Sequence, residues 1–299
     1  MNMNNRLKVA CFGEVLWDHF PTYSKIGGAP LNVALRLKSL GAEVTLISAI
    51  GNDQYGNQIQ ELLENSNIDT TELIKVSFKT GAVNVSLNEK GDASYDIVHP
   101  SAWDKIDYND KTAEKIANCD VFVFGSLSTR DEHSRNSLKN YLMKAQYKVF
   151  DVNLRAPHYT YEGIRDLMNY ADMIKLNDDE LFEVSWQLGS KFNSFKQNIE
   201  YLAKLTNTNT ICVTKGAFGA VLYQNGNFYN HNGFRVKVVD TVGSGDSFLA
   251  GMIYTLFTSH DPKKAIEIGC AIGALVANSE GGNPKIESKQ LEAFINPIL

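Results

Sequence analysis

Short apolar runs alternate with helical patterns along most of the chain. The runs contain many Val, Ile and Phe residues and few alternating polar ones, as expected for strands that are buried on both faces. They lie at residues 7–12, 44–49, 121–124, 147–151, 173–176 and 210–213. Patterns with helical spacing lie at residues 29–40, 52–66, 109–118, 131–145, 178–187 and 193–206. This alternation predicts an α/β fold with a Rossmann-like, mostly parallel central sheet flanked by helices.

Two regions depart from this alternation. Residues 14–26 follow the first strand but show no helical period, and residues 80–98 form two alternating strands around an N-E-K-G-D turn at 88–92. We interpret the two regions together as a small β-sheet that projects from the main sheet, and we call it the lid. The alternative is that residues 80–98 form an ordinary hairpin on the main sheet.

The C-terminal part is predicted to be helical. Apolar residues recur at helical spacing over 246–257, and Asp261 and Pro262 have the residue types of a helix N-cap and a first helical position. The sequence contains no internal repeat. We therefore interpret residues 1–299 as one domain, with the lid formed by about 14–26 and 80–98.

Composition narrows the range of functions. The chain has 299 residues, of which 43% are hydrophobic and 21% charged, and its net charge is −5, which argues against general nucleic-acid binding. Its four cysteines are far apart and form no C-x-x-C pair, which favours buried thiols in a reducing cytosol. The sequence shows no signal peptide and no apolar stretch of the ~18 residues that cross a bilayer, so we expect a cytoplasmic protein without membrane contact.

A glycine-rich turn, Gly243-Ser244-Gly245-Asp246, opens a predicted helix. It is not a dinucleotide fingerprint, because Phe248 stands where the third glycine would be, and the chain has no Walker-type loop. Asp246 alone could be a helix cap. The helix end should lower its pKa, which would make it a weak base. The alternative is that the turn's N–H groups hold a transferring phosphoryl group while Asp246 accepts a proton from the attacking hydroxyl.

Three further motifs carry polar residues at predicted element ends. In G-G-A-P-L-N-V-A, Asn32 follows a Gly-Gly turn and is either part of a capping cluster or a ligand for hydroxyls. Arg155 follows the strand at 147–151 and is either a phosphate partner or a member of a surface ion pair. Asn177 and Glu180 either cap a helix or bind near a metal ion.

Two of these motifs resemble the signatures of one family. Residues 240–253, D-T-V-G-S-G-D-S-F-L-A-G-M-I, are similar to the C-terminal signature of PfkB-type, ribokinase-like carbohydrate kinases. Residues 27–34, followed by Gly41 and Gly51, are similar to the N-terminal one. The resemblance covers nearly the whole chain. It implies a ribokinase-like fold and ATP-dependent transfer of a phosphoryl group to a sugar hydroxyl.

The resemblance also implies roles for individual residues. The catalytic base would be Asp246, assisted by Gly243, Ser244, Gly245 and Arg155. The sugar would contact Asp18, Gly28 and Asn32, and the nucleotide would contact Thr214, Gly216, Gly243 and Gly245. Asn177 and Glu180 would position Mg²⁺ through water, while Asp240 and the 280–284 loop would surround a monovalent cation such as K⁺. His99 and Trp103 follow the lid strands and are weaker candidates for reaching the sugar.

The substrate and assembly are expectations of the same kind. The G-G-A-P entrance is similar to fructokinase-like members, so we expect fructose to be converted to fructose 6-phosphate. The alternatives are 2-keto-3-deoxygluconate or ribose, and, outside enzymes, a catalytically silent sugar or nucleotide sensor. Lid strands in the family often pair between subunits, which leads us to expect a homodimer through the lid.

Overall fold

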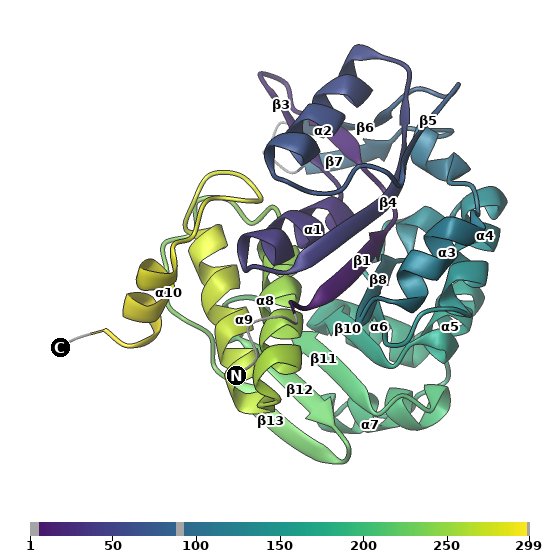
Figure 1. Cartoon of the computed structure of the whole chain (residues 1–299). Coiled ribbons are helices and arrows are strands. Elements are labelled where there is room, and N and C mark those ends of the chain that lie inside the picture. The colour runs from purple at the N-terminus through teal and green to yellow at the C-terminus, as the bar shows by residue number, and fades with distance from the viewer. Residues whose placement is uncertain (1–5, 88–92, 298–299) are drawn as a thin grey trace.

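The computed structural model describes residues 6–87 and 93–297. Within these residues, nine strands form one sheet in the order β13-β12-β11-β10-β9-β8-β1-β4-β5 (Figure 1). Their bounds are β1 Lys8–Phe12, β4 Glu43–Gly51, β5 Leu73–Val76, β8 Val121–Gly125, β9 Lys148–Asp151, β10 Met173–Asn177, β11 Thr210–Thr214, β12 Ala220–Gln224 and β13 Asn227–His231. The pairs from β5 to β11 are parallel and the last two pairs are antiparallel, which confirms the predicted mostly parallel sheet.

Helices cover both faces of this sheet (Figure 1). Their bounds are α1 Ala29–Ser39, α2 Gln54–Asn65, α3 Asp110–Ala117, α4 Glu132–Leu142, α5 Tyr161–Tyr170, α6 Asp178–Gln187, α7 Phe195–Thr206, α8 Ser244–Ser259, α9 Pro262–Ala277 and α10 Ser288–Ile295. Strand β1 shows why its sequence is continuously apolar. Val9 and Cys11 pack with α1, α8 and α9, whereas Ala10 and Phe12 pack with α3 to α7.

The lid is a separate four-stranded sheet. Strands β2 Leu16–His19, β3 Ser24–Gly27, β6 Gly81–Leu87 and β7 Ala93–Ile97 pair in the order β3-β2-β6-β7. This arrangement confirms the second sheet and excludes an ordinary hairpin on the main sheet. The N-E-K-G-D turn at 88–92 lies outside the described residues.

The β12–β13 hairpin was absent from the prediction. Its turn is Asn225-Gly226, and both residues have positive φ, 50° and 83°, as a two-residue hairpin turn requires. The N-G dipeptide between apolar residues was the signal that could have predicted this antiparallel edge. Strand β5 and helices α5 and α10 were also absent from the prediction.

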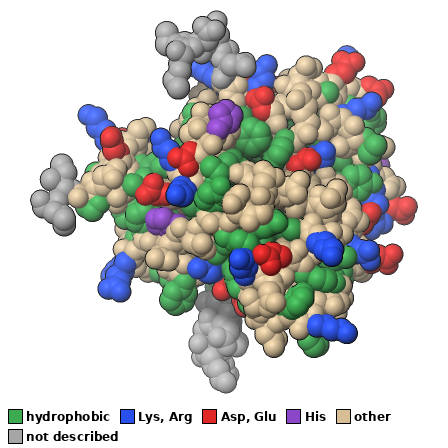
Figure 2. Space-filling view, turned by 90° about the horizontal axis from the view of Figure 1, so that it is seen from below, with side chains coloured by type: hydrophobic (Ala, Val, Ile, Leu, Met, Phe, Trp, Pro, Cys, Tyr) green, Lys and Arg blue, Asp and Glu red, His purple; other side chains and the backbone are tan. Residues whose placement is uncertain are grey.

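The surface carries both acidic and basic side chains. Figure 2 shows one face on which acidic and basic side chains are interspersed with hydrophobic ones. All four cysteines are buried and free. Among the helices of the described residues, none is long and apolar enough to cross a membrane.

Candidate active site

Asn32 and Asp246, 214 positions apart, meet directly. The Asn32 Nδ2 atom donates a hydrogen bond to Asp246 Oδ2 at 2.7 Å. Asn32 Oδ1 accepts a second bond, from Asn283 Nδ2, at 2.8 Å. The structure therefore brings the two signature motifs and the 280–284 loop together at one place, where the first turns of α1 and α8 face each other.

The environment of Asp246 raises its pKa to about 6, so the expectation that the helix end would lower it was wrong. Burial is the main cause, and the nearby carboxylate of Asp151 adds to it. The Asn32 hydrogen bond and the charges of Lys175 and Arg155 act in the opposite direction but do not offset burial. The result is a carboxylate that is more basic than a free aspartate.

Lys175 lies below the glycine-rich turn, and sequence reasoning missed it. It is buried in the middle of β10 and its Nζ atom lies 2.9 Å from Asp151 Oδ1. A Cβ atom at Gly245 would lie 3.7 Å from the same Nζ. Burial alone would lower the pKa of Lys175, but Asp151, Glu180 and Asp246 raise it overall. The available signal was a lone lysine within the apolar run 173–176.

The start of α8 leaves backbone donors unpaired. Gly243 has φ +71°, and a Cβ there would lie 2.5 Å from the carbonyl oxygen of Gly282, so the position requires glycine. The Ser244 N–H donates to Thr241 O at 3.2 Å. Within the described part of the chain, the N–H groups of Gly245 and Asp246 make no hydrogen bond. These two donors are available to an anion.

Asp18 lies in lid strand β2, and Gly28 lies at the adjoining turn between lid strand β3 and α1. Gly28 has φ +116°, and a Cβ there would collide with the carbonyl oxygen of Glu14. A Cβ at Gly27 would lie 2.5 Å from Asp18 Oδ2, so this carboxylate rests on the glycine backbone. Burial raises the pKa of Asp18 to about 6, against the opposing charges of Arg155 and Lys25. Asp18 therefore lies close to two cations.

Arg155 is exposed and lies among acids rather than in a surface ion pair. Its Nη1 donates to the carbonyl oxygen of Leu154 at 2.9 Å. Its charge acts to lower the pKa values of Glu14, Asp18 and Asp246, which places the guanidinium near all three. Arg155 therefore contributes positive charge to the part of the site that contains Asp18 and Asp246.

Glu14 is a second group that the sequence did not reveal. Its side chain is buried, and burial raises its pKa to about 7. Its Oε1 accepts the Ala29 N–H at 3.3 Å, whereas Oε2 has no partner within the described residues. Through this hydrogen bond, Glu14 holds the backbone that follows Gly28.

Asn177 and Glu180 form the capping box that was the alternative interpretation. Asn177 Oδ1 accepts the Glu180 N–H and Glu180 Oε2 accepts the Asn177 N–H, each at 2.8 Å. Glu180 Oε1 also accepts the Leu154 N–H at 2.8 Å. The box therefore begins α6 and fixes the loop that carries Arg155.

The expected nucleotide residues lie at the end of β11. Thr214 is its last residue, and its Oγ1 donates to Leu176 O at 3.4 Å. Gly216 follows with φ +52°, and a Cβ there would have no atom within 4 Å. This side of the site is open, which leaves room for a ligand.

Asp240 connects the lid to the C-terminal loops. Its carboxylate accepts the N–H groups of Val242 at 3.0 Å and Gly281 at 3.2 Å. Lys25, from strand β3 of the lid, lies 3.1 Å from Asp240 Oδ2. These contacts and the pairing with Lys25 lower the pKa of Asp240 despite its burial.

Trp103 does not line this site. Its ring is fully buried and Arg130 stacks on it, with the guanidinium carbon 3.9 Å from the ring centroid. His99 is about half exposed and faces Asp131 at 3.7 Å. The suggestion that Trp103 reaches the sugar was wrong, because the side chain is part of the core.

Comparison with known proteins identifies the family. Residues 7–289 match the family described as pfkB family carbohydrate kinase. The chain belongs to this family. Among its pfkB relatives, a fructokinase from Escherichia coli is 28% identical over 285 residues, which cover 88% of this chain and 89% of that protein. A probable fructokinase-7 from Arabidopsis thaliana is 28% identical over 312 residues, which cover 94% of this chain and 90% of that protein.

Solved structures agree with the pfkB assignment. A fructokinase double mutant from Vibrio cholerae O395, bound to fructose, ADP and a potassium ion, matches with a TM-score of 0.84 and 22% identity. The match covers 97% of this chain and 98% of that one. It confirms the ribokinase-like fold class. The family match makes the protein a pfkB family carbohydrate kinase, and the structural match shows that its fold is shared over nearly the whole chain.

Proposed function

We propose that this pfkB kinase is a cytoplasmic fructokinase that transfers the γ-phosphoryl group of ATP to fructose, giving fructose 6-phosphate. The observation that carries the proposal is the Asn32–Asp246 contact, because it joins the sugar side to the phosphoryl side of one site. The fructokinase names of the two sequence relatives support the choice of sugar.

In this mechanism Asp246 accepts the proton of the attacking hydroxyl. The hydroxyl oxygen bonds to the γ-phosphorus as the bond to the bridging β–γ oxygen breaks, and ADP leaves with that electron pair. The turn at 243–245 holds the transferring group, with the unpaired N–H groups of Gly245 and Asp246 as its donors. Arg155 and the buried Lys175 offset its negative charge.

The sugar is bound by acceptors and donors on the other side. Asp18 and Asn32 bind its hydroxyls, and the Gly28 backbone, which carries no side chain, allows close approach. The lid closes over the sugar and excludes water, which would otherwise accept the phosphoryl group. A second copy of the chain would pair with the lid edge, giving a homodimer.

The residues near Lys175 fit a magnesium ion that is bound mostly by phosphates and water. Asp151 Oδ2 is buried without a partner within the described residues, Asn177 ends the neighbouring strand β10, and Glu180 lies in the first turn of α6. When bound, magnesium would neutralise part of the phosphate charge. Asp151, Asn177 and Glu180 would orient its water ligands, while Thr214 and Gly216 border the nucleotide.

The surroundings of Asp240 suit a potassium ion less well than the residues near Lys175 suit magnesium. Its carboxylate already holds the Lys25 ammonium group. A monovalent cation at this carboxylate would have to displace that group or share Asp240 with it.

The test is ADP release with ATP and Mg²⁺ across fructose, ribose, 2-keto-3-deoxygluconate and a nucleoside. We expect the highest kcat/KM with fructose. A higher value with ribose or 2-keto-3-deoxygluconate would transfer the assignment to that sugar. Absence of turnover with every acceptor, combined with measurable ATP binding, would favour a sugar or nucleotide sensor.

A further inference from the structure

A cavity of about 300 Å³ lies outside the proposed active site. Its walls are α4, α5, the loop at 157–160 and His99, which follows the last lid strand. Arg155 precedes this loop by only two positions, and Thr129 and Arg130 in another wall follow the end of β8. The cavity therefore lies at the same edge of the sheet as the active site, on the side of α4 and α5.

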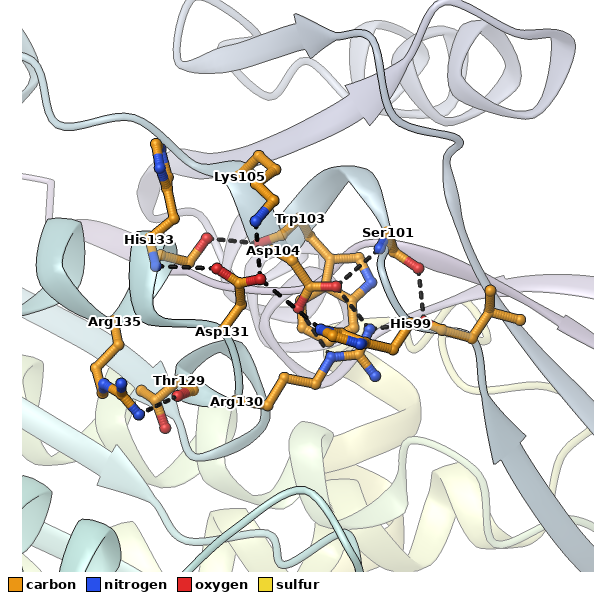
Figure 3. Close-up of polar contacts among 12 residues, drawn as sticks. His99, Ser101, Trp103, Asp104, Lys105, Thr129, Arg130, Asp131, His133 and Arg135 are labelled. Atoms are coloured by element: carbon orange, nitrogen blue, oxygen red, sulfur yellow. Dashed lines mark hydrogen bonds and ion pairs between the residues drawn. The ribbon is translucent and has the colours of Figure 1, made fainter.

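The cavity is lined by several cationic side chains, most of which already have acidic partners. Arg130 binds both carboxylate oxygens of Asp104, each at 2.8 Å (Figure 3). Lys139 lies 2.5 Å from Asp166. The charges of these two pairs are largely compensated within the protein.

Arg135 differs from the other cations. Its Nη1 donates a long hydrogen bond, 3.4 Å, to the carbonyl oxygen of Thr129 (Figure 3). Within residues 6–87 and 93–297 it has no carboxylate partner. A guanidinium has five donors in a planar fork, so most of the hydrogen-bonding capacity of Arg135 is available to a ligand in the cavity.

His158, a partly buried histidine, also lines the cavity. The pKa of His158 is lowered by burial and then by the charges of Arg130 and His99. Burial disfavours charge of either sign, so only the contribution of Arg130 and His99 would favour an anion, and the carboxylates of Asp104 and Asp96 oppose it. The cavity is at the lower end of the size range of small-molecule sites.

We propose that this cavity binds the phosphate group of a small molecule, with Arg135 as its principal ligand. Arginine suits this role because its fork can bind two phosphate oxygens at once. The bound group would contact the loop that follows Arg155 and the segment that leaves the lid, so its occupancy would restrain both.

The deciding experiment is calorimetric titration of the full chain with inorganic phosphate. A non-hydrolysable ATP analogue is kept saturating, so that phosphate cannot bind at the phosphoryl site. We expect Arg135→Gln to bind at least ~10-fold more weakly than the unsubstituted protein, the effect of losing a charged hydrogen bond. Arg165→Gln removes the same charge from an exposed position of α5 that does not line the cavity, and it should bind normally.

Unchanged phosphate binding by Arg135→Gln, or no binding by the unsubstituted protein, would overturn the proposal. If Arg135→Gln does not fold, Arg135→Lys tests the same contact. Lysine keeps the positive charge but cannot bind two phosphate oxygens at once, so we expect this variant to bind phosphate more weakly. The titration requires no turnover, so its result is independent of whether fructose is the substrate.

Kinetics then distinguish two sources of the phosphate group. If it belongs to a separate effector, phosphate changes the KM for fructose in the unsubstituted protein and not in Arg135→Gln. If it belongs to the acceptor, fructose 1-phosphate or 6-phosphate is phosphorylated, and Arg135→Gln raises KM for that acceptor alone.

Discussion

Asp246 combines the two properties that a general base needs, a suitable position and a suitable proton affinity. The Asn32 amide fixes one carboxylate oxygen, and burial beside Asp151 raises the pKa to about 6. A base of this strength is ionised at neutral pH and still accepts a proton more readily than a solvated aspartate. This environment predicts how activity responds to replacement of Asp246 and to a lower pH.

Replacing Asp246 by Asn should lower kcat at least ~10²-fold, the usual contribution of a general base. Binding of ATP should persist, because the unpaired N–H groups of α8 remain. ADP release and nucleotide titration measure the two effects. Asp179→Asn, which removes an exposed acid from the first turn of α6, is the matched control. A variant of Asp246 with near-normal turnover would disprove its role as base.

Activity should decline as pH falls through about 6. Asp246 and Asp18 both have pKa values raised to about 6, and both act in their charged forms. Lower pH protonates them together, so kcat/KM for fructose should fall with a log–log slope between one and two. A profile that stays flat from pH 7 to pH 5 would contradict these assignments.

At the scale of elements, two neighbouring strands and one helix supply the charges below the phosphoryl position. Strand β10 carries Lys175, β9 ends in Asp151, and α8 begins above them. The parallel register aligns Lys175 with Asp151, so the pair is built into the sheet and does not depend on loop conformation. Removal of either member leaves a buried charge.

Lys175→Met should reduce the free energy of unfolding by about 3–5 kcal/mol, because Asp151 would keep a buried charge without its partner. Urea denaturation measures this change. Replacing Asp151 by Leu in the same chain should restore much of the loss, since no buried charge then remains. Equal destabilisation in the single and double variants would contradict the argument.

The lid strand β3 and the loop after it are linked to the body by the Lys25–Asp240 pair. Lys25→Gln would leave Asp240 without its internal cation. We expect the Tm of this variant to rise with potassium concentration more steeply than that of the unsubstituted protein. Lys285→Gln, at a highly exposed lysine near the 280–284 loop, provides the control. Identical potassium responses would show that Lys25 does not compete for this carboxylate.

At the scale of the whole molecule, sequence patterns predicted the layers better than the contacts. Continuous apolar runs such as 7–12 predicted the buried parallel strands, because both faces of each strand pack on helices. The Asn225-Gly226 hairpin was overlooked although its turn residues were a clear local signal. Local patterns cannot report partners that are distant in the chain, and this limit explains most of what was missed at the site.

Three contacts illustrate this limit. Lys175 could be recognised only as a polar residue in a strand, because its partner and the glycine turn above it come from other elements. The pKa of Asp246 was predicted in the wrong direction because the sequence shows its helix but neither its burial nor its neighbour Asp151. The sequence left capping and metal binding open at Asn177; the structure shows the capping hydrogen bonds, and the metal role stays a prediction.

The Asn32–Asp246 contact has a consequence for how the protein is made. Asn32 leaves the ribosome 214 residues before Asp246. Until α8 and α9 follow, one face of the central strands lacks two of the helices that join α1 in burying Val9 and Cys11. The nascent chain must therefore carry an exposed apolar surface while these residues are made, which makes it a candidate for chaperone protection. The same timing keeps the incomplete chain from consuming ATP, because the base and its amide partner meet only after α8 has folded.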